Sequence, residues 1–160
     1  MSAAPAPDLS QIFTDLVRFQ IELWNAVDAR LRAEHGIPLG WVESMRIIDA
    51  RENCRVFDIA EELVVTVGGT SKIVDRLEAA GNCVRRSNPD DRRSSIIELT
   101  PAGLALLATG TATYTEELRR RLGAVLAPDQ LAAFGDTLTT LRAAGHAIAA
   151  SAVGKLVVTT

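Results

Sequence analysis

Cysteine is scarce in this sequence, and its scarcity restricts the class of protein. Only Cys54 and Cys83 occur among 160 residues, too few for a secreted scaffold that is held together by disulfides. Two isolated thiols fit a reducing cytoplasm, and we expect both cysteines to be structural. A role in sensing oxidants is the alternative, although nothing around either residue in the sequence predicts a lowered thiol pKa.

Long apolar runs are also missing. None approaches the roughly 20 residues that span a bilayer as a helix. The N-terminal residues MSAAPAPD lack both the basic and the apolar segment of a secretory signal. We therefore expect no signal peptide, no membrane partner and a cytoplasmic location.

Aromatic residues make up only 4% of the chain, so aliphatic side chains must build most of the core. Hydrophobic residues account for 48% and charged residues for 23%, which is typical of a globular domain and excludes a disordered chain. The net charge of -3 gives no overall attraction to nucleic acid. The placement of the positive groups, however, matters more than their sum.

The residue groupings of common enzymes are absent as well. The sequence has no convincing Ser/His/Asp or Cys/His arrangement, no phosphate-binding glycine loop and no supported pair of carboxylates. His35 and His146 have no compact set of further ligands, so a metal site is not expected. We predict a protein without enzymatic activity, cofactor or bound metal.

What the sequence does contain is a strong helical periodicity. Asp8 is a capping residue for a first helix, which has a nearly continuous apolar stripe and ends near Gly36. Trp41, Met45 and Ile48 then recur at the spacing of one face of a second helix. Alanine and leucine, both abundant, favour this conformation.

Two shorter helices are predicted next. The first covers residues 58–63, and the second runs from about Val67 to Ala80. Thr66 has the side chain of an N-cap, and Gly81 lies where a glycine ends a helix.

A hairpin follows these helices. Residues 84–86 and 95–99 are strand candidates, and the polar run 87–94 between them predicts the hairpin loop.

Two long helices complete the predicted order. Thr100 and Pro101 begin a helix with apolar residues as far as Val125. A final helix is expected from Pro128 to about Ala150, followed by a tail without a clear period.

Two short helices followed by a hairpin are the order of a winged helix-turn-helix. In this arrangement the second short helix enters the major groove, where each base pair shows a distinct pattern of hydrogen-bonding groups. The hairpin loop reaches the neighbouring backbone or the minor groove, where arginine is favoured. The predicted fold is therefore mainly α, with a small β-hairpin wing and long N- and C-terminal helices.

Four segments of the sequence together resemble one known family. They are Asp58–Leu63, Thr66–Gly81, Cys83–Arg86, and Asp91-Arg92-Arg93 followed after five residues by Leu99-Thr100-Pro101-Ala102-Gly103. In type and spacing they are similar to the helix-turn-helix and wing of MarR family transcriptional regulators, over roughly residues 39–107. The combined spacing is specific, whereas any one segment alone would be weak.

The resemblance implies a homodimeric regulator that binds a double-stranded DNA operator. It implies one domain over residues 1–160, with a winged-helix lobe over about 40–107 and dimerisation helices over about 8–35 and 108–150. The regulator is expected to be a repressor that a small-molecule effector releases. The alternative is a winged-helix module that binds proteins without specific DNA binding.

The resemblance also implies roles for individual residues. The residues expected at DNA are Thr66, Gly68, Gly69, Ser71, Lys72, Arg76, Asp91, Arg92 and Arg93. Ser71 and Lys72 are expected to read base edges or phosphates. Arg93 is expected to support the wing or to enter the minor groove, with Asp91 as its ionic partner, and Arg92 is the more exposed phosphate contact.

Gly68 and Gly69 depart from the polar residues more often found at these positions of the family. They lower helix propensity, but they allow a close approach of the backbone to DNA. Between Thr66 and Ser95, six basic and four acidic residues give a local charge of +2, opposite in sign to the whole chain.

An effector pocket between the dimerisation helices and the winged-helix lobe is implied as well. Trp24, Trp41 and Met45 are its candidate lining. Packing alone explains these three side chains equally well.

Overall fold

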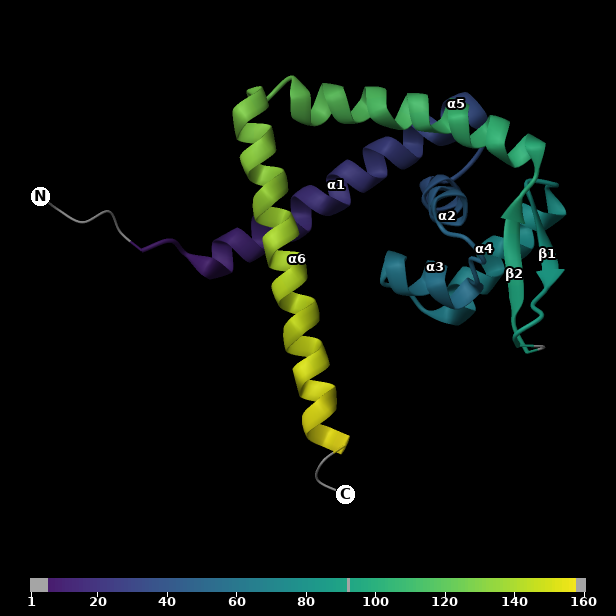
Figure 1. Cartoon of the computed structure of the whole chain (residues 1–160). Coiled ribbons are helices and arrows are strands. Elements are labelled where there is room, and N and C mark those ends of the chain that lie inside the picture. Colours follow the sequence, from purple (N-terminus) through teal and green to yellow (C-terminus); the bar gives the residue numbers. More distant parts are fainter. Residues whose placement is uncertain (1–5, 92, 158–160) are drawn as a thin grey trace, which may run out of the picture. The chain divides into compact units, whose positions relative to one another are not determined.

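The structure is a computed structural model that describes residues 6–91 and 93–157. Its elements are, in chain order, α1 (Leu9–His35), α2 (Leu39–Ala50), α3 (Val56–Leu63), α4 (Val67–Ala79), β1 (Cys83–Ser87), β2 (Ser95–Leu99), α5 (Pro101–Leu118), the π-helical turn η1 (Arg119–Gly123) and α6 (Pro128–Val157) (Figure 1). The chain forms two compact units, residues 1–117 and residues 118–160. None of the described helices has an apolar stretch of the length that crossing a membrane requires.

The helix α1 begins and ends where the sequence predicts. The Asp8 carboxylate accepts hydrogen bonds from the backbone N–H groups of Ser10 and Gln11, at 2.9 and 3.2 Å. At the other end, Gly36 has a left-handed φ of 69° and donates its N–H to the carbonyl of Arg32. A glycine adopts this conformation without a steric penalty, so the helix ends there.

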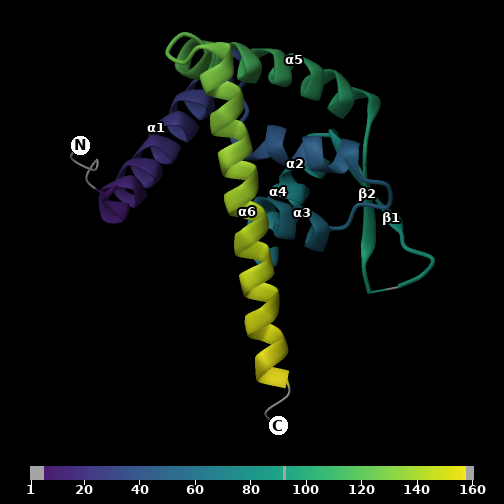
Figure 2. The same ribbon diagram turned by 60° about the vertical axis from the view of Figure 1, so that its left-hand side comes forward.

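Much of α1 carries apolar side chains that its own unit leaves uncovered. The buried residues of this helix are Val27 and Leu31. Nearer the N-terminus, large apolar side chains are exposed to between 38% and 75%; they are Leu9, Ile12, Phe13, Leu16, Val17, Phe19, Ile21 and Trp24. This half of α1 extends away from α2, α3 and α4 in both views (Figure 1, Figure 2). An apolar surface of this extent is typical of an interaction surface.

The core of the first unit lies where α2, α3 and α4 meet. Its fully buried side chains include Val42 and Met45 of α2, Ile59 of α3, and Val74 and Leu77 of α4. Each such aliphatic side chain contributes about 1.5–3 kcal/mol when it leaves water. The inward face that the periodicity predicts for α2 is confirmed.

The helix α3 begins at Val56, earlier than the predicted start at Asp58. Asp58 occupies the third position of the helix, and its carboxylate accepts the backbone N–H of Arg55 at 2.8 Å. This is one half of a capping box, and it stabilises a helix start before Asp58.

The turn between α3 and α4 has an unusual backbone. Val64 has a φ of 56°, in the left-handed region that β-branched residues avoid. Its N–H donates to the carbonyl of Glu61 at 3.2 Å, and the Val65 N–H donates to the carbonyl of Ala60 at 3.0 Å. These bonds satisfy carbonyls at the end of α3 and hold the turn of the helix-turn-helix in place.

The hairpin is antiparallel, with Cys83 opposite Leu99 and Ser87 opposite Ser95. It stands beside the helices of the first unit, with its loop at the free end (Figure 2). The Ile97 N–H also donates to the Cys54 carbonyl at 2.7 Å, which ties the hairpin to the segment before α3. The strand β1 is one residue longer at each end than predicted, and β2 has its predicted bounds. The winged helix-turn-helix fold is confirmed.

The start of α5 explains the Leu-Thr-Pro-Ala-Gly motif in physical terms. The Thr100 hydroxyl accepts the Gly103 N–H at 3.1 Å, as an N-cap does. It also donates to the Gly81 carbonyl at 2.6 Å, and the Thr100 N–H donates to the Asn82 carbonyl at 3.1 Å. A Cβ atom on Gly103 would lie only 1.9 Å from the Asn82 carbonyl oxygen. Only glycine fits here.

The long helix predicted from Thr100 through Val125 is interrupted, so this prediction is wrong. The helix α5 ends at Leu118, and Arg119–Gly123 form a π-helical turn. The Ala124 N–H donates to the Arg119 carbonyl at 2.9 Å, the five-residue spacing of a π-turn. Apolar spacing alone does not reveal a turn of this kind, because the side chains on either side keep a helical pattern.

The helix α6 begins at Pro128 as predicted, but it continues to Val157, past the predicted end near Ala150. Residues 151–157 lack the apolar period on which the prediction depended. The sequence therefore does not mark this extension of the helix.

Replacing Gly103 by alanine is expected to destabilise the protein by about 1–3 kcal/mol or more, because α5 must move away from Asn82 to make room. Urea unfolding of the purified variant measures the loss. Gly68→Ala is the matched control, since a Cβ on Gly68 meets nothing within 4 Å; it is expected to leave stability unchanged or to raise it by up to about 1 kcal/mol. Equal stabilities of the two variants would contradict the packing argument.

Candidate nucleic-acid interface

The outward face of α4 carries the side chains expected at DNA. At 3.6 residues per turn, Gly68, Lys72 and Arg76 lie on one side of the helix, and all three are exposed. Val74 and Leu77 are buried on the opposite side. The helix therefore presents a polar face with two cations to the solvent.

Thr66 and Ser71 lie at the margin of this face. Ser71 is half-buried, so it occupies the edge of the outward face and not its centre. Thr66 is exposed, but its hydroxyl oxygen accepts the Gly69 N–H at 3.2 Å and caps α4, as the sequence predicts. Contacts of these two residues with DNA remain predictions.

Two adjacent positions in the first turn of α4 have no side chain that could obstruct an approach. Gly68 and Gly69 are exposed, and a Cβ on Gly68 would meet nothing within 4 Å. The N–H groups at a helix start carry the positive end of the helix dipole, which favours phosphate. The backbone of Gly68 and Gly69 is therefore exposed at the N-terminal end of α4, where the helix dipole favours an anion.

Two arginines beside α4 are already paired with acids. Arg85 of β1 makes ion pairs with Glu78 and, at 2.6 Å, with Asp75, both on α4. Arg86 pairs with Glu98 across the hairpin at 2.5 Å. Glu98 lies outside the segment counted in the sequence, so the local charge of +2 overstates the positive charge that DNA would meet.

Three other basic side chains of this region are not paired with acids. In the part of the chain that the structure describes, Lys72, Arg76 and Arg93 have no acidic partner. All three side chains are exposed. Because no internal contact accounts for their charge, they are the cations best suited to phosphate groups.

The wing loop is organised differently from the expectation. No side-chain ion pair joins Arg93 to Asp91, both of which the structure describes; the Asp91 carboxylate instead accepts the Arg93 backbone N–H at 3.0 Å. The Arg93 guanidinium is thereby left for another partner. Arg92, the expected phosphate contact, lies outside the described residues.

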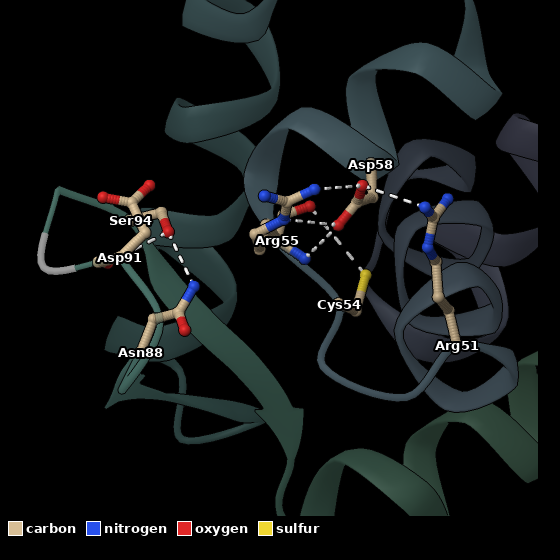
Figure 3. A network of polar contacts seen from close by, with 7 residues as sticks. All are labelled: Arg51, Cys54, Arg55, Asp58, Asn88, Asp91 and Ser94. Atoms are coloured by element: carbon tan, nitrogen blue, oxygen red, sulfur yellow. Dashed lines mark hydrogen bonds and ion pairs between the residues drawn. The ribbon is translucent and has the colours of Figure 1, made fainter.

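A cluster of charges at the base of the wing was missed by sequence reasoning (Figure 3). The Asp58 carboxylate has an exposed fraction of 3% and contacts the guanidinium groups of Arg51 and Arg55, each at 3.1 Å. Beside it, the Asn88 amide donates to the Ser94 hydroxyl at 2.9 Å and folds back the wing loop. Residues of the cluster and of the loop line one hollow of about 540 Å³. The position of Asp58, three residues after Arg55, was the available signal.

Two effects of opposite sign act on Asp58. Burial alone raises the pKa of its carboxyl group. The hydrogen bonds from Arg55 and the positive charges of Arg51 and Arg55 outweigh burial, so the pKa lies below its ordinary value. The carboxylate is therefore charged at neutral pH and holds both arginines.

A second network, also missed from the sequence, joins α1 to α5. The Thr113 hydroxyl donates to Glu34 at 2.8 Å, so its oxygen accepts the Nε2–H of His35, also at 2.8 Å. Glu117, with an exposed fraction of 6%, pairs with Arg30 at 3.3 Å. The network fixes the C-terminal part of α1 against α5 through buried polar groups.

The three candidate effector-pocket residues differ in their surroundings. Met45 is completely buried, so packing accounts for it. Trp41 is half-buried, and Trp24 is 41% exposed on the apolar part of α1. A pocket formed by these residues remains a prediction.

Both cysteines lie inside the protein as free thiols. Burial raises the pKa of Cys54 and that of Cys83 to about 11. Because the thiolate is the reactive form, a raised pKa disfavours reaction at neutral pH. Their environment favours the structural role over the sensing of oxidants.

The winged-helix region is similar to a known protein family. Residues 42–95 match the model of the MarR family. This segment is about a third of the chain and includes α3, α4 and β1. Comparison with curated proteins gives no significant match.

Solved structures extend the similarity beyond the MarR segment. The MarR family regulator Sco3205 from Streptomyces coelicolor, in complex with DNA, is 19% identical over 88% of this chain and 91% of that chain, with a TM-score of 0.76. The repressor CouR, bound to a 23-mer DNA duplex, is 26% identical over 88% of this chain and 99% of that chain, with a TM-score of 0.75. CouR from Rhodococcus jostii bound to p-coumaroyl-CoA is 22% identical over 85% and 95%, with a TM-score of 0.73.

Asp58→Asn is expected to lower the free energy of unfolding by about 1–3 kcal/mol at neutral pH, because it removes charged hydrogen bonds. The folded-state pKa lies below the unfolded value near 3.9, so this contribution is complete above about pH 5 and disappears as the pH falls through both values. Urea unfolding at neutral and acidic pH should show the difference from wild type shrink in acid. Asp49→Asn, on the exposed side of α2, is the control; a difference that stays constant with pH would contradict the assignment.

A thiol-specific reagent is expected to modify neither cysteine of the folded protein at neutral pH, since both thiols are buried and protonated. After denaturation both should react. Mass spectrometry before and after unfolding counts the modified sites. Rapid modification of either residue in the folded protein would restore the oxidant-sensing alternative.

Proposed function

We propose that this protein is a homodimeric transcriptional regulator that binds a specific double-stranded DNA operator through α4 and the wing. The observation that carries the proposal is the exposed, unpaired set of Lys72, Arg76 and Arg93 on the two elements that a winged helix-turn-helix presents to DNA. Two structural relatives that were solved with DNA support it.

In this proposal α4 lies in the major groove. The Gly68 backbone approaches DNA closely, and the exposed N–H groups at the start of α4 meet a phosphate. Lys72 contacts a base edge or a phosphate, and Arg76 contacts the backbone. Arg93 enters the adjacent minor groove, where the negative potential favours arginine. Arg92 and Asp91 belong to the same wing contact, Asp91 by shaping the loop that carries both arginines.

The dimer follows from the uncovered apolar side chains of α1. In water these side chains, from Leu9 to Trp24, would remain exposed in a lone protomer. We assign dimerisation to residues 8–35 and 108–150, and the winged-helix lobe to residues 40–107, all in one MarR-type domain. Two recognition helices would then meet half-sites about 34 Å apart, one turn of DNA.

Repression and its release are the finer part of the proposal. A bound dimer at an operator blocks transcription, and a small-molecule effector favours a dimer whose two lobes no longer match the half-sites. CouR, which is solved with p-coumaroyl-CoA as well as with DNA, is a structural relative in which both kinds of partner are present.

The test is selection of duplexes from a random-sequence library by the full chain, followed by measurement of the dissociation constant in increasing salt. Lys72→Gln, Arg76→Gln and Arg93→Gln are each expected to weaken binding, by about fivefold at 0.15 M salt for each phosphate that the protein no longer neutralises. The slope of log K against log salt should fall by about one for each of these phosphates.

Arg46→Gln is the matched control, because Arg46 is an exposed arginine on α2 that pairs with Glu43 and lies outside α4, the wing and the segments assigned to dimerisation. It should leave both affinity and salt slope unchanged. Sedimentation of every variant should give a dimer. Failure to enrich any duplex would overturn the regulator and favour the protein-interaction module, and unchanged binding by the three glutamine variants would remove α4 and the wing as the DNA-binding surface.

A further inference from the structure

Resting on the proposed function, we propose that Val67 determines part of the operator sequence by packing against the 5-methyl group of a thymine in the major groove. Val67 is the first residue of α4 and is 49% exposed. The N-terminal residues of a recognition helix are those that contact base edges. An aliphatic side chain at this position therefore faces bases once α4 is in the groove.

The surrounding positions of α4 leave apolar contact as the main means of recognition. At 3.6 residues per turn, Val67, Gly68, Ser71 and Lys72 lie within an arc of about 140° at the N-terminal end of the helix. Gly68 has no side chain, and Ser71 is half-buried. Lys72 is the one charged residue of the arc. Neither the paired groups that read adenine nor those that read guanine with two hydrogen bonds are present in the first turn.

The cap of α4 strengthens this conclusion. The Thr66 hydroxyl oxygen accepts the Gly69 N–H at 3.2 Å, which holds this side chain at the cap of the helix and leaves its O–H as a donor. What projects from the first turn is then the pair of Val67 methyl groups beside the bare Gly68. Of the groups that base pairs expose in the major groove, only the thymine methyl is apolar.

The apolar surface continues into the turn before α4. Val64 is 81% exposed and Val65 is 50% exposed. Three exposed valines thus occur within four residues, and the unpaired cation Lys72 follows about one and a half turns after Val67 on the same helix. When Lys72 binds a phosphate, it keeps the N-terminal end of α4 close to the bases. The valine methyl groups then leave water when DNA binds.

The experiment uses the duplex enriched by the full chain from the random library. Each thymine of its half-sites is replaced in turn by uracil, which keeps every hydrogen-bonding group and lacks only the methyl group. At one thymine position the wild-type protein should bind about fourfold more weakly, the equivalent of about 0.8 kcal/mol for one buried methyl group. Replacement in both half-sites should cost about fifteenfold.

Val67→Ala is the decisive variant. It should bind the thymine duplex more weakly than wild type does, and uracil at the sensitive position should cost it nothing further. Uracil at the other thymines should affect both proteins equally. Leu104→Ala removes an exposed aliphatic side chain of α5 (46% exposed), outside α4, the wing and the segments assigned to dimerisation, and should keep the full uracil penalty. Circular dichroism confirms folding, and Val67→Thr, with the shape of valine, provides a second variant.

The outcomes separate this inference from the function on which it rests. Enrichment of a duplex whose affinity is insensitive to uracil, or a uracil penalty that persists in Val67→Ala, overturns the thymine contact and leaves the regulator intact. Failure to enrich any duplex overturns both.

Discussion

The start of α5 lies directly on the turn that ends α4, and the placement of both the recognition helix and the wing depends on this contact. The Thr100 hydroxyl bonds to the Gly81 carbonyl at 2.6 Å, and the absent side chain of Gly103 lets the helix touch the Asn82 carbonyl. Gly81, with a φ of 76°, turns the chain from α4 into β1 at the same place. The helices α4 and α5 and the strand β1 are thereby held at one point, because backbone groups of the turn after α4 bond to the start of α5.

Charged side chains of the winged helix fall into two groups with different roles. Arg51 and Arg55 share the buried Asp58, and Arg85 and Arg86 have acids of their own. These arginines support the scaffold. Lys72, Arg76 and Arg93 lack such partners in the described part of the chain, and their cost of desolvation on binding is not increased by breaking an internal pair. A count of basic residues in the sequence cannot separate these groups, since pairing depends on the fold.

Most of the fold could be predicted because its determinants are local. Asp8, Thr66 and Gly81 mark helix ends by capping chemistry, and the polar run between the strands marks the hairpin. The π-turn at residues 119–123 and the extension of α6 to Val157 were missed, because apolar spacing neither detects a wider helical turn nor is needed for a helix. Of the candidate site, the outward face of α4 was predicted from helical geometry.

Other parts of the site depend on distant residues and could not be predicted from the sequence. Ser71 is half-buried because of what packs beside α4, which no spacing rule reveals. Asp58 joins Arg51 and Arg55 across the segment between α2 and α3. The Thr113 contacts with Glu34 and His35 join residues separated by most of the winged helix.

The two ion pairs of Arg85 restrain the position of the hairpin relative to α4. One guanidinium on β1 is held by two carboxylates a turn apart on α4, so the hairpin cannot slide along the helix without breaking both contacts. The distance from α4 to the wing is thereby restrained within each protomer. In the proposed dimer, the separation between the two winged helices is set elsewhere, by the residues that join the protomers.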